Sequence, residues 1–250
     1  MNPRLHLAAL AAALLAAASA PRPAAAQSKA DAFAGKIPPV SGQLFQKAGR
    51  LELTPSFGMS LNDAFFTKYF GGLDVAYHAT ESWSLIASVE GGAATRSGSA
   101  VRCDASTGCT SASTAELRQV PGRIHGIAAL AVAWSPVYGK LNVFAEQVAH
   151  FDLTLIGGVD AIARDQILST ADAGLLEKNG GSPKLVTTAG FHLGVGAHLF
   201  FSQALAARLV VKDVIYPVKV PNNGPGNDWQ NQLFTEIGLS VFFPTHNRQR

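Results

Sequence analysis

The sequence predicts an all-β protein, an eight-stranded antiparallel transmembrane up-and-down β-barrel. Eight segments alternate apolar with small or polar residues, which is the period-two pattern of strands. Short and long connections alternate between these segments, and aromatic residues gather near both of their ends. Of the 250 residues 48% are hydrophobic and only 15% are charged. Even so, after the N-terminal segment no apolar run reaches the roughly 20 residues that a membrane helix needs.

The N-terminus has the anatomy of a secretory signal peptide, which we place at residues 1–26. Arg4 supplies the positive region, residues 5–18 form a short apolar region, and Ala24-Ala25-Ala26 is a small-residue cleavage site before Gln27. A retained anchor helix is the alternative, but the apolar stretch is shorter than a membrane span. We expect residues 27–48 to form a periplasmic N-terminal extension, 49–243 the outer-membrane barrel and 244–250 a periplasmic tail.

The charge balance excludes several kinds of partner. Removing Arg4 and Arg22 from the 20 basic residues leaves 18 against 17 acidic residues, a net charge of +1. A net charge so close to zero argues against nucleic acid or any other strongly charged partner. We therefore expect outer-membrane lipid and other envelope proteins as partners, and no nucleic acid.

The first four strands are expected before residue 136. Their clearest alternation covers residues 51–60, 73–78, 83–90 and about 123–135. In the third, Leu85 and Val89 alternate with Ser88 and Glu90. The segments are mostly about ten to fifteen residues long, which exceeds the usual soluble strand and suits a tilted strand that crosses a bilayer.

The last four strands are expected after residue 149, with alternation over residues 150–155, 189–199, 205–212 and 232–243. The sixth strand of the barrel is the clearest, because apolar residues from Ala189 to Leu199 alternate with glycine and histidine. Each of the eight strands thus has one face suited to lipid.

The connections and the aromatic residues distinguish a membrane barrel from a soluble sandwich. Short links at 80–82, around 136–140 and at 201–203 alternate with long ones at 62–70, 93–122, 160–187 and 217–230. This is the outer-membrane pattern of tight periplasmic turns and long external loops. Two aromatic girdles are expected at the membrane interfaces. Near the short turns lie Tyr77, Trp83, Trp134, Tyr138, Phe151, Phe200 and Phe243, and near the long loops lie Phe65, Phe66, Tyr69, Phe70, Tyr216 and Trp229.

The two cysteines, Cys103 and Cys109, lie in a Ser/Thr/Gly-rich loop. An oxidising periplasm would pair them in a disulfide. Zinc is the alternative, but it would need more ligands than two thiols. The short closed loop gives the disulfide only about 2 kcal/mol of stabilisation by the chain-entropy argument.

The inward faces of the strands collect charges of both signs, which must pair inside a narrow lumen. We expect a lumen charge network of Glu52, Glu90, Arg208, Lys212 and Glu236, in which Arg208 pairs with Glu236. The same inward set includes Asp74, His78, Arg123, His125, His150, Asp152, His192 and His198. His192 and His198 lie about 20 Å apart along a strand, too far for one metal ion, and Gly194-Val195-Gly196 lacks the rest of a dinucleotide loop. No cofactor, metal or catalytic residue is therefore predicted.

Four stretches resemble a known family: SFGMSLND at 56–63, SPVYGKLNVF at 135–144, HFDL at 150–153, and the segment from Arg208 to DVIY at 213–216. They are similar to the outer-membrane β-barrel domain family found mainly in myxobacteria and related deltaproteobacteria. The similarity covers nearly all of the mature chain. It implies a small barrel from a family whose members are mostly of unknown function, and for some relatives a place in envelope complexes of gliding motility. The Cys103–Cys109 loop and the polar tail after Phe243 depart from the family pattern.

The function expected from the sequence is that of a non-enzymatic outer-membrane anchor or scaffold that contacts other envelope proteins through its external loops or its periplasmic extension. Long loops on a rigid scaffold are where binding concentrates, and Leu175-Leu176 forms an exposed apolar point there. A narrow channel is the first alternative. A lipid-modifying hydrolase is the second, but it would need its histidine at the external rim facing lipid, whereas the histidines here face inward.

Overall fold

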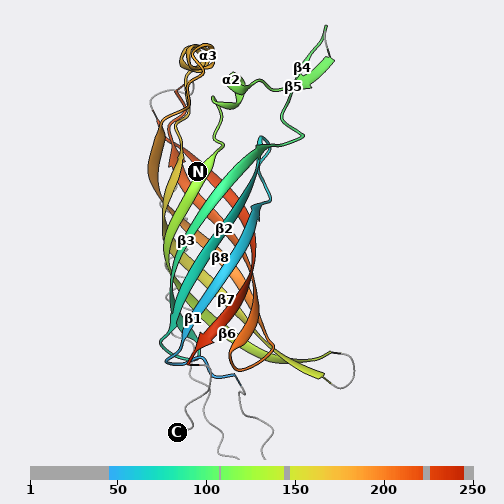
Figure 1. Ribbon diagram of the computed structural model, residues 1–250, viewed down its shortest axis with the longest axis vertical. Coiled ribbons are helices and arrows are strands. Elements are labelled where there is room, and N and C mark those ends of the chain that lie inside the picture. Colours follow the sequence, from blue (N-terminus) through green and yellow to red (C-terminus); the bar gives the residue numbers. More distant parts are fainter. Residues whose placement is uncertain (1–44, 107, 144–146, 222–225, 245–250) are drawn as a thin grey trace, which may run out of the picture. The chain divides into compact units, whose positions relative to one another are not determined.

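The computed structural model in Figure 1 describes residues 45–106, 108–143, 147–221 and 226–244. The chain divides into two units, Met1–Gly42 and Gln43–Arg250, and all of the described residues belong to the second. The predicted signal peptide at 1–26, most of the predicted extension at 27–48 and nearly all of the tail at 244–250 lie outside the described residues. These boundaries stay predictions.

Eight antiparallel strands close into a barrel. They are β1 (Leu51–Ser60), β2 (Phe66–His78), β3 (Trp83–Arg96), β6 (Ile124–Val143), β7 (Gln147–Asp165), β8 (Leu185–Phe200), β9 (Leu205–Val218) and β10 (Asp228–Phe243). Each barrel strand pairs with the barrel strands that precede and follow it in the chain, so that β3 pairs with β6. The first and last strands, β1 and β10, pair to close the sheet. Figure 1 shows the strong tilt of these strands, which closure into a barrel requires. The predicted fold class is confirmed.

The strand β6 corrects one predicted turn. Residues 136–140 were expected to form a short link, but β6 runs on to Val143 and pairs with β7 as far as Gln147. The pairing shifts register between Trp134 and Val137, so Val137 continues the apolar outward face. Because β3 begins at Trp83, opposite Trp134, Pro136 faces no further strand on that side and its missing N–H costs no ladder hydrogen bond. The β6–β7 hairpin therefore extends past the barrel, as the lower part of Figure 1 shows.

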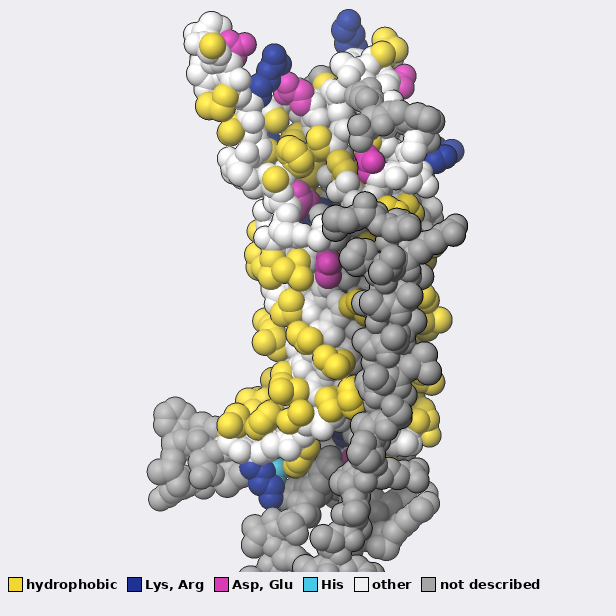
Figure 2. All heavy atoms as spheres, turned by 180° about the vertical axis from the view of Figure 1, so that it is seen from behind, with side chains coloured by type: hydrophobic (Ala, Val, Ile, Leu, Met, Phe, Trp, Pro, Cys, Tyr) yellow, Lys and Arg dark blue, Asp and Glu magenta, His cyan; other side chains and the backbone are white. Residues whose placement is uncertain are grey.

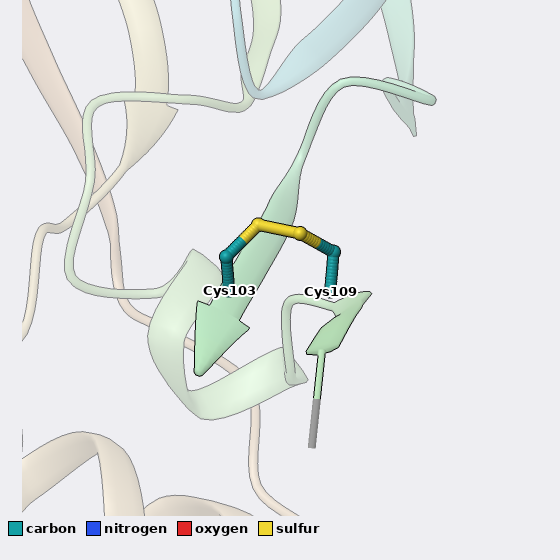
Figure 3. Close-up of a disulfide and its surroundings, with 2 residues drawn as sticks. All are labelled: Cys103 and Cys109. Atoms are coloured by element: carbon teal, nitrogen blue, oxygen red, sulfur yellow. A yellow bond between two sulfur atoms is a disulfide. The ribbon is translucent and has the colours of Figure 1, made fainter. Parts of the chain in front are cut away.

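The long connections contain structure of their own. The strands β4 (Val101–Asp104) and β5 (Gly108–Ser111) form a hairpin after β3, followed by the short helix α2 (Thr114–Leu117). Cys103 and Cys109 face each other across this hairpin, with Cα atoms 3.9 Å apart, and are joined by a disulfide (Figure 3). Between β7 and β8 lies α3 (Thr170–Lys178), which contacts α2. No helix in the described part of the chain is long and apolar enough to cross a bilayer.

Helix α2 begins with a capping box. The side-chain oxygen of Ser113 accepts a hydrogen bond from the backbone N–H of Glu116, and the Ser113 N–H donates to the Glu116 carboxylate at 2.7 Å. These hydrogen bonds satisfy backbone groups that a helix leaves open at its start. The bond from the Ser113 N–H also lowers the pKa of the Glu116 carboxyl below its usual value. The loop thus carries an ordered turn of helix rather than only a polar link.

The alternation of the strands sorts side chains into two environments. Odd-numbered residues of β1, such as Leu53 and Phe57, are exposed on the outside, whereas even-numbered ones, such as Glu52 and Thr54, are buried in the lumen. In Figure 2 hydrophobic side chains cover the middle of the visible barrel wall, and most charged ones gather at its ends. This distribution is the reverse of a soluble protein, because the charges are inside and the apolar side chains are outside.

Candidate functional site

The outer wall carries aromatic side chains toward both of its ends. Near the short turns Tyr77, Trp83 and Phe243 are exposed, and Trp83 stacks on Trp134 of the paired strand with ring centroids 6.0 Å apart. Toward the long loops Trp229 is exposed and lies 6.3 Å from Phe191. Amphipathic aromatic rings at two levels of an apolar wall are the signature of membrane interfaces.

Five of the predicted interface aromatics turn into the barrel instead. Phe66, Phe70 and Phe200 are at most 5% exposed, because the even-numbered residues of β2 and β8 face inward. Tyr216 is only 2% exposed and points into the lumen with Val214 and Val218, because even-numbered residues of β9 face inward. Tyr138 also turns inward, and its phenol oxygen lies 2.7 Å from Nδ1 of His150. The register shift after Trp134 explains the correction for Tyr138, since it places Val137 rather than Tyr138 on the outside.

The sheet of eight strands is closed, so its backbone N–H and C=O groups can form hydrogen bonds with each other where lipid offers no water. Its outer wall is apolar with aromatic bands, and its charged side chains pair with each other in the interior. The chain is a membrane-spanning β-barrel of the outer-membrane type. Asp213 of β9 is a charged residue on the outward face, between Leu193 and Leu233 of the neighbouring strands.

The periplasmic end of the lumen is filled by a connected network of histidines and carboxylates. Glu52 lies 2.8 Å from Nε2 of His78 and 3.1 Å from Nε2 of His198. The other ring nitrogen of His198 lies 2.8 Å from Asp152, which accepts from the Lys47 ammonium at 2.6 Å. Ser240 and Thr54 donate further hydrogen bonds to Glu52. Every charged group in this layer therefore has a partner, as burial in a narrow lumen requires.

Residues just before β1 close the periplasmic mouth below this network. Phe45 stacks on Phe200 with ring centroids 5.2 Å apart and meets the edge of His150. The backbone N–H of Lys47 donates to Glu81 in the turn between β2 and β3, at 2.8 Å. Arg50 donates to the carbonyl oxygen of Phe242 at 3.2 Å. Sequence reasoning assigned Phe45 and Lys47 to the free extension and missed this role, since their positions lack strand periodicity.

A second charge cluster occupies the middle of the lumen. Arg208 donates to Asp74 at 2.8 Å. Lys212 pairs with Glu236 at 2.8 Å and also with Glu90. The structure thus places all five residues of the predicted lumen network inside the barrel, but the predicted Arg208–Glu236 pair is wrong. Arg208 lies opposite Gly238 in the paired strand and turns to Asp74 across the lumen.

Glycines make room for these long charged side chains. Gly58, Gly72 and Gly194 lie directly opposite Glu236, Glu90 and Lys212 in the paired strands. A Cβ atom at Gly72 would lie 2.7 Å from Cγ of Glu90 and 3.0 Å from the carbonyl oxygen of Val89. The interior of an eight-stranded barrel is barely wide enough for side chains. Each of these long charged side chains therefore requires a neighbouring position that has no side chain, which glycine provides.

Apolar layers separate and cover the charge clusters. Ala76, Ile86, Ala131, Ala133, Ile156 and Val210 lie between the two clusters. Toward the external end a larger layer contains Phe70, Ile124, Ile127, Ile162, Ile167, Val214, Tyr216, Val218 and Phe234. Phe70 and Phe234 meet edge to face there, with ring centroids 5.1 Å apart. The described part of the lumen is therefore filled along its length.

Other polar groups near the external end pair within the protein. His192 lies 2.8 Å from Asp160, and Lys68 contacts both Asp63 and Gln232. Sequence reasoning missed Asp160 because it began the loop there, although Asp160 has the same parity as Asp152 on β7. The signal was thus present in the alternation.

Two residues predicted to face inward do not. Arg123 is exposed and its guanidinium lies over the ring of Phe66, 5.7 Å from the centroid. His125 is also exposed and lies 2.8 Å from Asp165. A register shift between Ile124 and Gly126 breaks the alternation at the start of β6, so extrapolating it back to residue 123 failed.

The lumen offers little space for a ligand or for ions. A cavity of about 10 Å³ lies between the two charge clusters, beside Glu52, His198 and Arg208. That volume holds about one water molecule. The described residues contain no group of three or more side chains that could hold a metal ion. The charged and apolar side chains of the described lumen are thus arranged for pairing and stability, and this cavity is too small for a substrate.

No protein-family model and no curated protein sequence matches the chain. Among solved structures, the N-terminal β-barrel domain of Pseudomonas aeruginosa OprF is similar, with a TM-score of 0.46, 11% identity, and coverage of 79% of this chain and 100% of that one. The outer membrane protein OprG from Pseudomonas aeruginosa gives a TM-score of 0.40 at 12% identity, over 80% and 98% of the two chains. Neisserial surface protein A gives 0.37 at 8% identity, over 77% and 94%. The fold assignment rests on the strand pairing of this chain itself.

We predict that Gly72→Ala destabilises the barrel by about 1–3 kcal/mol, the usual cost of overpacking. The new methyl group would press on Glu90 and on the backbone of Val89. The adjacent Gly71→Ala is the matched control, because Gly71 faces outward and a Cβ there meets nothing within 4 Å. Urea unfolding of the detergent-solubilised barrel measures both. Equal stability of the two variants would contradict the role of Gly72.

We predict that Arg208 couples to Asp74 more strongly than to Glu236. Arg208→Met and Asp74→Asn should each be costly, because each leaves a buried charge without its partner. In the double variant the cost should be less than the sum, by about 1–3 kcal/mol. Double-mutant cycles from urea unfolding give this coupling energy, and the Arg208→Met/Glu236→Gln cycle is the control. A larger coupling in the control cycle would restore the pair that sequence reasoning preferred.

Proposed function

We propose that the protein is a closed, non-enzymatic anchor or scaffold of the bacterial envelope, inserted in the outer membrane. The observation that carries this proposal is the filled lumen. It contains the two charge clusters, the two apolar layers described above, and a third apolar group of Phe200, Ala206 and Phe242. A barrel closed in this way has its accessible surfaces at its two ends and on its lipid-facing wall. Binding to other molecules must then use those surfaces.

The ends of the barrel favour a scaffold. At one end the β4–β5 hairpin, α2 and α3 give the long connections a fixed structure, and Leu175 of α3 is 60% exposed. At the other end the β6–β7 hairpin reaches past the barrel, with Leu141 exposed on it. Exposed apolar side chains on structured projections suit contacts with other proteins. The resemblance to the myxobacterial barrel family is what supports a place in a gliding-motility complex within this proposal.

The alternatives fit the geometry less well. A channel needs a continuous path, and the cavity between the charge clusters holds about one water molecule. A lipid-modifying hydrolase needs a nucleophile and base facing lipid at the rim. His78, His192 and His198 instead bind carboxylates inside the lumen. The scaffold therefore requires no rearrangement of the described residues, whereas the other two functions do.

We predict that the purified protein shows no steady ion conductance in planar lipid bilayers at neutral pH, because its lumen is filled by paired side chains. Single-channel recording measures this directly, with a general porin reconstituted in parallel as the positive control. Stepwise, persistent currents from the wild-type protein would replace the scaffold with a narrow channel.

We predict that a photo-crosslinking residue at Leu175 or Leu141 captures discrete envelope proteins in intact cells. The same residue at Leu130, which is 64% exposed on the outer wall of β6, should capture lipid and is the control. Mass spectrometry of the crosslinked products identifies the partners. If all three positions yield the same pattern of lipid adducts, the scaffold proposal fails.

A further inference from the structure

The wall of the barrel opens between β8 and β9 at its external end. The two strands pair from Phe200 opposite Ala206 up to Phe191 opposite Ile215. Beyond that point β8 continues back to Leu185, paired only with β7, and β9 continues to Val218, paired only with β10. The two strand ends therefore diverge above Phe191, and a cleft of about 560 Å³ lies beside them. That volume falls within the range of typical small-molecule sites.

Positive charge gathers around this cleft. Arg164 of β7, Lys184 before β8 and Lys219 after β9 all line it. None of the three forms an ion pair with another residue in the described part of the chain. This contrasts with the lumen cations Lys47, Lys68, Arg208 and Lys212, each of which pairs with a carboxylate. Cations from three different segments around one cleft, without carboxylates, indicate an anionic ligand.

The arginine is held in place by the barrel itself. Its Nε donates to Thr188 Oγ1 at 3.1 Å and its Nη1 donates to the carbonyl oxygen of Asp165 at 3.2 Å. The nearby Asp165 carboxylate lies 2.8 Å from His125 instead. A guanidinium fixed in this way is preorganised for an oxyanion, and two lysines beside it add mobile point charges.

The walls and position of the cleft narrow the class of ligand further. Apolar side chains, among them Ile167, Val186 and Val220, line it together with the cations, so the ligand has an apolar part. Pro217, which also lines the cleft, lies opposite Trp229 in the sheet. Since Trp229 and Phe191 form the aromatic pair toward the long loops, the cleft begins at the level where lipid headgroups lie.

We propose that this cleft binds a phosphate monoester through Arg164, Lys184 and Lys219. A phosphate monoester carries close to two negative charges at pH 7, whereas a carboxylate carries one. The three positive charges of the cleft are therefore better balanced by a phosphate monoester than by a carboxylate. The ester can belong to a lipid headgroup at the external interface or to a soluble molecule, since both present the same chemistry. Neither the closed lumen nor the scaffold function requires this site.

The test uses the full-length mature protein in detergent and two defined probes. Phosphatidic acid presents the phosphate monoester on a lipid, glycerol 3-phosphate presents it in solution, and phosphatidylcholine is the reference lipid. Native mass spectrometry measures the retained lipid, and competition by glycerol 3-phosphate separates the two sources. We expect preferential retention of phosphatidic acid. Competition by the soluble ester at comparable concentration would assign the site to a soluble ligand, and lack of competition would assign it to lipid.

Three double variants test the role of the cations. Lys184→Gln/Lys219→Gln removes two exposed cations of the cleft, and each lost contact should weaken binding about tenfold, as expected for a hydrogen bond to a charged group. Lys178→Gln/Arg102→Gln removes two exposed cations that do not line the cleft and should leave binding unchanged. Lys184→Arg/Lys219→Arg should restore it. Equal binding by all variants, or no preference for either phosphate probe over phosphatidylcholine, would overturn the proposal.

Discussion

Pairing of buried charge inside a narrow lumen is the constraint on which the rest of this structure depends. Eight strands leave an interior that side chains fill, and a charge left there without a partner costs several kcal/mol. The chain meets this constraint with two clusters, Glu52–His78–His198–Asp152–Lys47 and Asp74–Arg208 beside Glu90–Lys212–Glu236. Apolar layers between and above them keep water out, which strengthens the pairing.

The same constraint explains the glycines and the strand register. Lys212 can reach Glu90 and Glu236 only if the positions beside these side chains are empty, and Gly194, Gly72 and Gly58 provide that space. A slip of one residue in any strand would turn its charges toward lipid and its leucines into the lumen. The charge clusters therefore fix the register as firmly as a hydrophobic core fixes that of a soluble sheet.

Period-two alternation was sufficient to predict the fold and to place the five residues Glu52, Glu90, Arg208, Lys212 and Glu236 in the lumen, because a barrel wall has only two faces. The alternation was not sufficient to predict which of these charged residues pair with each other. Arg208 and Glu236 lie on neighbouring strands, but Arg208 turns across the lumen to Asp74, and the distance between these two residues depends on the tilt of the whole sheet. The irregularities near Trp134 and Ile124 misplaced Tyr138, Arg123 and His125, since one extra residue in a strand inverts every assignment beyond it. Tyr216 was a different error, because the alternation of β9 already placed it inside.

The segment before β1 shows how the closed lumen and the function at the ends are connected. Lys47 completes the periplasmic charge cluster, and Phe45 covers it by stacking on Phe200. The chain that leads away from Phe45 therefore starts at the barrel mouth, held by a buried ion pair, by the hydrogen bond from Lys47 to Glu81 and by aromatic packing. Pulling on that chain would have to break the buried Lys47–Asp152 pair, which would leave His198 as the remaining charged partner of the Asp152 carboxylate. The charge pairing that closes the lumen thus also fastens the preceding segment to the barrel, and a firm attachment of this kind is what an anchor in the membrane needs and a conducting pore does not.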